Sequence, residues 1–296
     1  MKVILQYISL TIFLSIIFLS CEKNYPVRGS EKKLVLNSVF TADSSWRLKL
    51  TNTKDPYSED SILTISDASI SIILDKNNIG FFSHTSNGIY TTDYVPKAKD
   101  VLSIEIKKDG YEDITANTYI PRKILLRGLS KEIVVNNENE KNIRYILLGD
   151  IAENYYLIVR HIVYKESVSL NNDTIPFLDT VSIQGVSSFF ENILPPYANV
   201  KCLFGFRKNN SQEKISFQSY DGFVKNENLI KGISRIEVYS CSKEYYEYQK
   251  SLVRYKWSNH DINTSIINSS ELYTNVNNGL GVFAGFNKVI LLDTFK

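Results

Sequence analysis

The chain has 296 residues, with 34 Lys and Arg against 32 Asp and Glu and a formal net charge of +2. These charges are dispersed, so composition gives no electrostatic case for binding nucleic acid. The length is enough for a full core and predicts two domains rather than one. The 19 Tyr and 15 Phe, with many Ile, Val and Thr, favour β-strands.

The first twenty residues have the pattern of a secretory signal peptide. A positive charge follows the initiator methionine, residues 3–19 are mostly apolar, and the small residue Ser20 stands directly before Cys21. This ending resembles bacterial lipoproteins, in which the cysteine becomes the mature N-terminus and carries a diacylglyceryl group. The alternative is an uncleaved membrane anchor, but seventeen residues interrupted by polar side chains are short for a span. We therefore predict residues 1–20 as signal peptide and Cys21 as the lipidated residue.

Residues 21–33 are polar and predict a tether between the lipid and the first domain. Residues 34–121 then contain seven short β-like segments with turn signals between them. The segments are 34–40, 46–50, 68–74, 79–83, 89–92, 101–107 and 114–120. This pattern predicts an immunoglobulin-like or transthyretin-like β-sandwich.

Pro121 is predicted to end the sandwich, because proline is disfavoured inside a central strand. The remainder, 122–296, is predicted to be a second β-rich domain with one helix. Its main strand candidates are 155–165, 200–206, 215–219 and 233–239. The overall expectation is a mainly β protein of two domains.

The helix is predicted over residues 242–257, with Ser242 as its N-terminal cap. Its aromatic and aliphatic side chains recur at spacings of three, four and three, which places them on one face. They are Tyr245, Tyr248, Leu252 and Tyr255, and the face is widened by Tyr246, Val253 and Trp257. We expect this face to pack on a sheet rather than to bind a cofactor.

Residues 277–285 read NNGLGVFAG, whose glycines have the spacing GxGxxxG. A dinucleotide-binding loop needs GxGxxG at the start of a helix and an acidic residue about twenty positions later. Only eleven residues follow, and they favour a strand. We predict a tight turn at 277–279, then a strand in which Gly281 and Gly285 allow a bulge or close backbone packing. This strand is expected to help close the second domain near the helix.

Other chemistry is sparse. His84, His161 and His260 are scattered without the spacing of a metal site, and no cofactor is predicted. Cys202 and Cys241 either form a disulfide or are small buried hydrophobic residues, and two cysteines alone do not decide between these. No nucleophile or calcium-loop motif is complete.

Two stretches, GYEDITANTYIP in the first domain and ELYTNVNNGLGVFAG near the C-terminus, resemble a known family. It is domain of unknown function 4249, a lipoprotein family of Bacteroidota, and the likeness covers nearly the whole mature chain. Its most specific residues here are Tyr245, Tyr246, Tyr248, Asn275, Gly279, Gly281 and Phe283. The resemblance implies an outer-membrane lipoprotein, often encoded beside a TonB-dependent receptor, and implies no catalytic residues.

A glycosylation pattern of Bacteroidota, in which Asp is followed by Ser or Thr and an aliphatic residue, occurs three times. It marks Ser61, Thr174 and Thr180 as candidate O-glycosylation sites.

These features predict a non-enzymatic, membrane-anchored lipoprotein of the cell envelope that faces the periplasm or the cell surface. It would act as an accessory or binding component of a TonB-dependent outer-membrane transporter. It would help the transporter to capture a nutrient, which is an unknown small ligand, or help to organise the assembly. One alternative is a surface adhesion or scaffold protein with the sandwich as a spacer. The other is a hydrolase with an unrecognised site.

Overall fold

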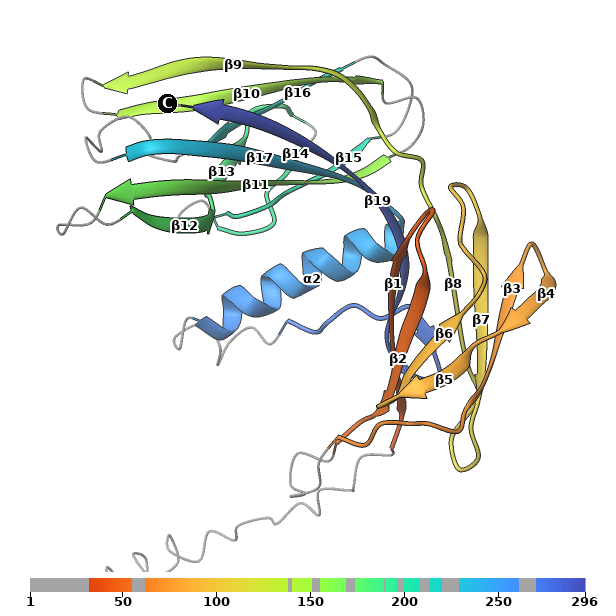
Figure 1. Ribbon diagram of the computed structural model, residues 1–296. Coiled ribbons are helices and arrows are strands. Elements are labelled where there is room, and N and C mark those ends of the chain that lie inside the picture. Colours follow the sequence, from red (N-terminus) through yellow and green to blue (C-terminus); the bar gives the residue numbers. More distant parts are fainter. Residues whose placement is uncertain are drawn as a thin grey trace, which may run out of the picture.

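The computed structural model is mainly β, as the composition predicts, and its described residues form three sheets and one helix (Figure 1). The predicted signal peptide, Cys21 and most of the predicted tether lie outside the described residues. The structure describes residues 32–54, 62–137, 140–150, 155–168, 174–188, 190–195, 198, 200–207, 213–219, 229–260 and 270–295.

Nineteen strands and the helix follow one another along these segments. In chain order they are β1 (Leu34–Thr41), β2 (Trp46–Asn52), β3 (Ser69–Leu74), β4 (Asn77–Phe81), β5 (Ser83–Ser86), β6 (Ile89–Thr92), β7 (Val101–Lys107), β8 (Ile114–Tyr119), β9 (Leu125–Asn137), β10 (Glu140–Asp150), β11 (Tyr155–Val168), β12 (Thr174–Thr180), β13 (Ile183–Gly185), β14 (Phe190–Glu191), β15 (Leu203–Arg207), β16 (Glu213–Ser219), β17 (Leu229–Cys241), α2 (Lys243–His260), β18 (Val276–Asn277) and β19 (Leu280–Phe295).

The N-terminal part is a β-sandwich of two sheets. One sheet has the order β19-β1-β2-β6-β5 and is continuous with the sheet of the second part, while the other has the order β18-β8-β7-β3-β4. Alternate residues of β1, β7 and β8 are buried, because successive side chains of a strand point to opposite faces. The predicted sandwich is therefore present, but two of its strands come from the C-terminal end of the chain.

Trp46 lies at the centre of the sandwich core and has no exposed surface. Its ring is 4.5 Å from that of Phe40, 4.9 Å from Phe82 and 5.8 Å from Phe283. Because a buried indole N–H needs an acceptor, Nε1 donates a hydrogen bond to Ser38 Oγ over 2.9 Å. Phe283 comes from β19, so the last strand of the chain completes the first core.

The long strand β19 runs from the sandwich into the second part (Figure 1). Residues 280–286 pair in parallel with β1, and residues 286–295 pair antiparallel with β17. As expected, this C-terminal strand helps to close the second part, through its second half. Its first half belongs to the sandwich, which was not expected. Alternation of apolar residues shows that a strand forms, but it carries no information about which distant strand is the partner.

The second part is built around the antiparallel strands β11 and β17. One face of this sheet packs on the four-stranded sheet β13-β16-β10-β9. The buried residues between the two sheets are Ile124, Tyr145, Leu147, Tyr155, Leu157, Val159, Ile183, Leu203, Ile215, Phe217, Ile236 and Val238. The other face carries α2, so this part has three layers.

The helix begins where it is predicted to and ends three residues later than predicted. Ser242 caps it, because Ser242 Oγ accepts a hydrogen bond from the Tyr245 N–H over 3.2 Å. Tyr245 and Tyr246 are buried and Tyr248 is half-buried, whereas Tyr255 is 42% exposed. Only the first turns of the predicted aromatic face therefore pack on the sheet. Within the part of the chain that the structure describes, no helix has the length and apolarity needed to cross a membrane.

Candidate functional site

Asn275 fastens the C-terminal strands to the sandwich. Its Nδ2 donates to the Phe283 carbonyl over 2.8 Å, and its Oδ1 accepts from the Phe283 N–H over 2.9 Å. The same Nδ2 also lies 3.1 Å from the carbonyl of Asn117 on β8. The Asn275 carboxamide thus bonds both the N–H and the carbonyl of Phe283, as a residue of a neighbouring strand would. A carboxamide can do this because it carries both a donor and an acceptor.

The glycines of the same segment allow backbones to approach closely. Gly281 has φ +109°, and a Cβ there would lie 1.9 Å from the Leu36 carbonyl oxygen. A Cβ on Gly285 would lie 2.6 Å from the carbonyl oxygen of Tyr119. Close backbone packing at both glycines is therefore confirmed. In the preceding turn the residue with positive φ is Asn278, at 59°. At Gly279 a Cβ would be about as close as packing permits, 3.0 Å from Ile114, Leu34 and Val276.

The sandwich also contacts the start of α2 through side chains. Thr118 Oγ1 donates to Glu244 Oε2 over 2.9 Å, and the Tyr119 hydroxyl donates to the Cys241 carbonyl over 3.4 Å. Burial first, and then the nearby Glu244 carboxylate, raise the pKa of Tyr119, so it remains a neutral donor. These contacts join β8 to the end of β17 and the first turn of the helix.

A pocket of about 680 Å³ opens at this junction. Its lining residues come from the turn after β3, from β7 and β8, and from the first turn of α2. They are Asp75, Lys76, Val101, Ser103, Asn117, Thr118, Tyr119 and Glu244. The accessible lining is more apolar than polar, with hydroxyl, carboxamide, carboxylate and ammonium groups set among the apolar atoms. This mixture is usual for small-molecule sites and suits a small solute that has both apolar surface and polar groups.

The pocket was not predicted from the sequence, although its β8 residues, 117–119, lie in the stretch GYEDITANTYIP that resembles the family. The lining comes from four elements without a fixed spacing along the chain, so no single motif could have identified it. The only sequence signal in their neighbourhood is the pair of stretches that resemble the family, GYEDITANTYIP and ELYTNVNNGLGVFAG. Those stretches pair with each other as β8 and β18.

The tyrosines at the start of α2 contact the edge strand β14. Tyr246 donates its hydroxyl to Glu191 Oε1 over 2.7 Å, and the Lys250 ammonium pairs with Glu191 Oε2. Burial acts to raise the pKa of Glu191, but the hydrogen bonds from Lys250 and Tyr246 outweigh it and hold that pKa below its usual value. Tyr246 also packs its ring on Tyr156 and Phe204. These family-specific tyrosines hold the helix on the sheet.

His161 has partners that sequence reasoning missed. Its Nδ1 lies 3.0 Å from Ser219 Oγ and its Nε2 lies 2.8 Å from Ser234 Oγ, which in turn is 2.8 Å from the Tyr145 hydroxyl. A Ser–His contact can activate a nucleophile, but all four side chains are buried between the two sheets of the second part. The arrangement satisfies buried polar groups in the core. His84, by contrast, is exposed.

Glu237 forms a second buried polar cluster, on the face of the sheet that carries α2. Its carboxylate accepts hydrogen bonds from Tyr239 over 2.5 Å and Arg235 over 2.6 Å, and Lys288 Nζ lies 3.4 Å away. Burial acts to raise the pKa of Glu237. The Tyr239 hydrogen bond and the charges of Lys288 and Arg235 outweigh it and hold the pKa below its usual value.

We expect the free energy of unfolding of Glu237→Gln to fall less steeply than that of the wild type as the pH is lowered into the acid range. A carboxyl whose folded-state pKa is lowered contributes stability above its unfolded pKa, ordinarily about 4.5, and loses it as pH falls through the lower folded value. Urea unfolding at pH 7 and at progressively lower pH measures this. Glu112→Gln, an exposed carboxyl elsewhere, is the control and should keep the wild-type slope. Equal slopes for Glu237→Gln and wild type would contradict the assignment.

Cys202 and Cys241 are free and buried in the same hydrophobic cluster. Leu203, next to Cys202, pairs with Val159 on one side of β11. Cys241 pairs with Tyr156 on the other side. Cys202 is therefore offset from Cys241 by about 13 Å along β11 and about 9.6 Å across two strand spacings, against a disulfide limit of about 7 Å between Cα atoms. The disulfide that the sequence left open is not formed, and both cysteines pack as small hydrophobic residues.

The remaining predicted sites are only partly described. Cys21 and Ser61 lie outside the described residues, Thr174 begins β12, and Thr180 ends it with a half-buried side chain. The described segments bring together no group of three His, Cys, Asp or Glu side chains that could hold a metal ion.

Comparison with known proteins gives one strong match. The family model of domain of unknown function DUF4249 matches residues 22–289. The chain belongs to this family. The match includes the whole sandwich, the junction pocket and the residues of β18 and of β19 up to 289 that complete the first core. The family membership predicted from GYEDITANTYIP and ELYTNVNNGLGVFAG is thereby confirmed.

Other comparisons add little. No curated protein matches the chain. A solved structure described as "Putative membrane anchored protein from Corynebacterium diphtheriae" is 9% identical, covers 71% of this chain and has a TM-score of 0.22. The chain spans 54% of that protein's length. A similarity this low does not bear on fold or function.

Proposed function

We propose that this protein is a non-enzymatic lipoprotein of the outer membrane that serves as an accessory or binding component of a TonB-dependent transporter. The observation that carries the proposal is the position of Cys21. It follows a short apolar leader that ends in Ser20, and ten residues, 22–31, separate it from the first described residue, Lys32. A folded β protein thus begins directly after a lipidation signal.

The junction pocket is the proposed site for a small solute that has both apolar surface and polar groups. It lies between the two parts of the molecule, where ligand sites occur preferentially, and its volume is in the range of known ligand sites. The lining includes the carboxylates of Asp75 and Glu244 and the carboxamide of Asn117, which can accept and donate hydrogen bonds to a bound solute. Binding there would let the protein present a nutrient to a transporter.

Replacing Cys21 with Ala should release the protein from membranes into the soluble fraction. A lipoprotein with two or more acyl chains is anchored stably, whereas the polypeptide without lipid has no comparable affinity for the bilayer. Fractionation of cells followed by immunoblotting measures the change, and Lys23→Ala, which leaves the cysteine intact, is the matched control. A Cys21→Ala protein that stays in the membrane fraction after a high-salt wash would refute lipid anchoring.

The transporter partner is tested separately. Affinity purification of the lipidated protein from detergent-solubilised outer membranes should enrich a barrel transporter in amounts comparable to the bait. If only the bait is recovered after chemical cross-linking in intact cells, the accessory role fails and the scaffold alternative is favoured. This experiment uses the membrane-anchored protein, so it follows the Cys21→Ala test and asks only about the partner.

A further inference from the structure

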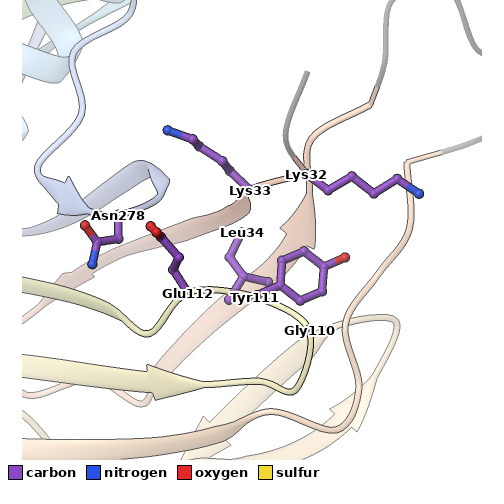
Figure 2. A pocket seen from close by; sticks show the side chains of 7 residues that line it. All are labelled: Lys32, Lys33, Leu34, Gly110, Tyr111, Glu112 and Asn278. Carbon is purple, nitrogen blue, oxygen red and sulfur yellow. The ribbon is translucent and has the colours of Figure 1, made fainter. Parts of the chain in front are cut away.

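A second pocket, of about 400 Å³, lies at the end of the sandwich where β1 begins. Leu34 forms its buried floor, and the other residues used here are Lys32, Lys33, Tyr111, Glu112 and Asn278. Figure 2 shows the side chains of Lys33, Glu112 and Asn278 pointing to one side of the start of β1, and those of Lys32 and Tyr111 to the other. One cation, Lys33, therefore lies on the same side as the Glu112 carboxylate and the Asn278 carboxamide, and the second cation, Lys32, lies on the other side.

The charged groups of this pocket are not used within the described structure. Lys32, Lys33 and Glu112 take part in no side-chain hydrogen bond or ion pair among the described residues, although the main-chain N–H of Lys33 donates to Thr53 Oγ1 over 3.0 Å. Nearby charges are already paired, since Lys108 lies 3.1 Å from Asp67 and Lys107 lies 3.0 Å from Glu105. Two ammonium groups and one carboxylate are left for an external ligand.

The position of the pocket limits what can reach it. Ten residues, 22–31, separate Cys21 from Lys32, so the lipid lies no farther than about 40 Å along the chain from this end of the sandwich. The second part of the molecule lies at the opposite end of β1 and β19 (Figure 1). The tethered end and the pocket are therefore the same end of the protein.

We propose that this pocket docks the sandwich on the bilayer by binding the zwitterionic headgroup of phosphatidylethanolamine. The phosphate is bound by Lys33, and the headgroup ammonium by the Glu112 carboxylate and the Asn278 carboxamide oxygen, which lie on the same side of the start of β1 as Lys33. Lys32, on the other side, adds positive charge without contacting the same phosphate. Tyr111 lies at the rim, where an amphipathic ring suits the headgroup region. The inference rests on the proposed lipid anchor, and it gives the anchored protein a fixed orientation.

Zwitterionic lipid fits this pocket better than anionic lipid. A surface that binds anionic membranes needs a cluster of cations with few carboxylates. Here Glu112 lies in the pocket itself, and Asp109 and Asp113 flank it in the same loop. A headgroup with one negative and one positive charge matches the two kinds of side chain, whereas a purely anionic headgroup meets repulsion from Glu112.

The test uses the mature chain with Cys21→Ser, so that binding is measured without the lipid. Co-sedimentation is compared for vesicles of phosphatidylcholine alone, phosphatidylethanolamine with phosphatidylcholine, and phosphatidylglycerol with phosphatidylcholine. We expect binding to the phosphatidylethanolamine vesicles, weakened about fivefold or more by either Lys33→Glu or Glu112→Lys. The double variant, with both charges exchanged, should recover part of the loss. Lys97→Glu, an exposed lysine outside this pocket, is the control.

The remaining outcomes each overturn the proposal. Preference for phosphatidylglycerol vesicles would show a general cationic surface. Binding of soluble O-phosphoethanolamine in the pocket, without vesicle binding, would show a site for a free metabolite. No binding to any vesicle would remove membrane docking while leaving the lipid anchor, which the Cys21→Ala fractionation tests on its own. Thermal unfolding of each variant checks that all remain folded, which the exposure of Lys33 and Glu112 predicts.

Discussion

Residues 32–121 expressed alone should not fold into a cooperative domain, and a synthetic peptide of residues 272–287 should restore folding. Without the C-terminal strands, β1 loses seven paired positions with β19 and β8 loses its pairing with β18. The core also loses Phe283, and removing a buried Phe side chain costs about 3–5 kcal/mol. That is a large part of the roughly 5–15 kcal/mol that stabilises a whole domain.

Fluorescence gives a direct readout, because the chain has only two tryptophans and Trp46 is the one in this segment. Addition of the peptide should shift the Trp46 emission to the blue and produce a single thermal transition. A peptide with Phe283→Ala is the control and should bind at least about tenfold more weakly. A cooperative transition of 32–121 without any peptide would show that the sandwich is independent of β19.

The same dependence affects deletion experiments on the intact chain. Removing residues 34–121 would expose Phe283 and leave the first half of β19 without its partner β1. Loss of activity after such a deletion would then report unfolding rather than a role of the sandwich. Point substitutions at the surface are the safer test.

Gly281→Ala should destabilise the protein by about 3 kcal/mol or more. A side chain at φ +109° is strained, and its Cβ would also overlap the Leu36 carbonyl oxygen, 1.9 Å away, in the paired strand β1. Neither backbone can move without breaking the pairing of β19 with β1. Chemical denaturation followed by circular dichroism measures the loss.

Gly110→Ala is the matched control. Gly110 also has positive φ, +83°, but a Cβ there meets nothing within 4 Å, so only the conformational cost of about 1 kcal/mol is expected. The difference between the two variants isolates the steric overlap with Leu36. If both variants lost the same free energy of unfolding, the backbones of β19 and β1 would not be as close at Gly281 as they are in the structure.

Local patterns in the sequence predicted local structure well. The capped helix follows from Ser242 and the spacing of its tyrosines, and the strands of the sandwich follow from alternation between turn signals. The need for glycine at 281 and 285 was also visible from their place between apolar strand residues. Each of these depends on neighbours within a few positions along the chain.

Properties that depend on distant partners were not visible. The parallel pairing of β1 with β19 joins residues about 245 positions apart, as between Val35 and Leu280. The same limitation hid the contact of His161 with two serines and left the bridging of Cys202 with Cys241 undecided. The junction pocket is built from four separate elements, so its residues have no common signal in the sequence.

The continuous strand β19 also determines how the molecule bears mechanical load. If the lipid holds the start of β1 and a partner pulls on the second part, the tension runs from β1 to β19 and on to β17. Because β1 and β19 are parallel and would be pulled from opposite ends, the seven paired positions between them are strained together, in shear. Such a connection resists force far better than strands that are peeled apart one hydrogen bond at a time. An anchored protein that works beside a moving transporter would benefit from this arrangement.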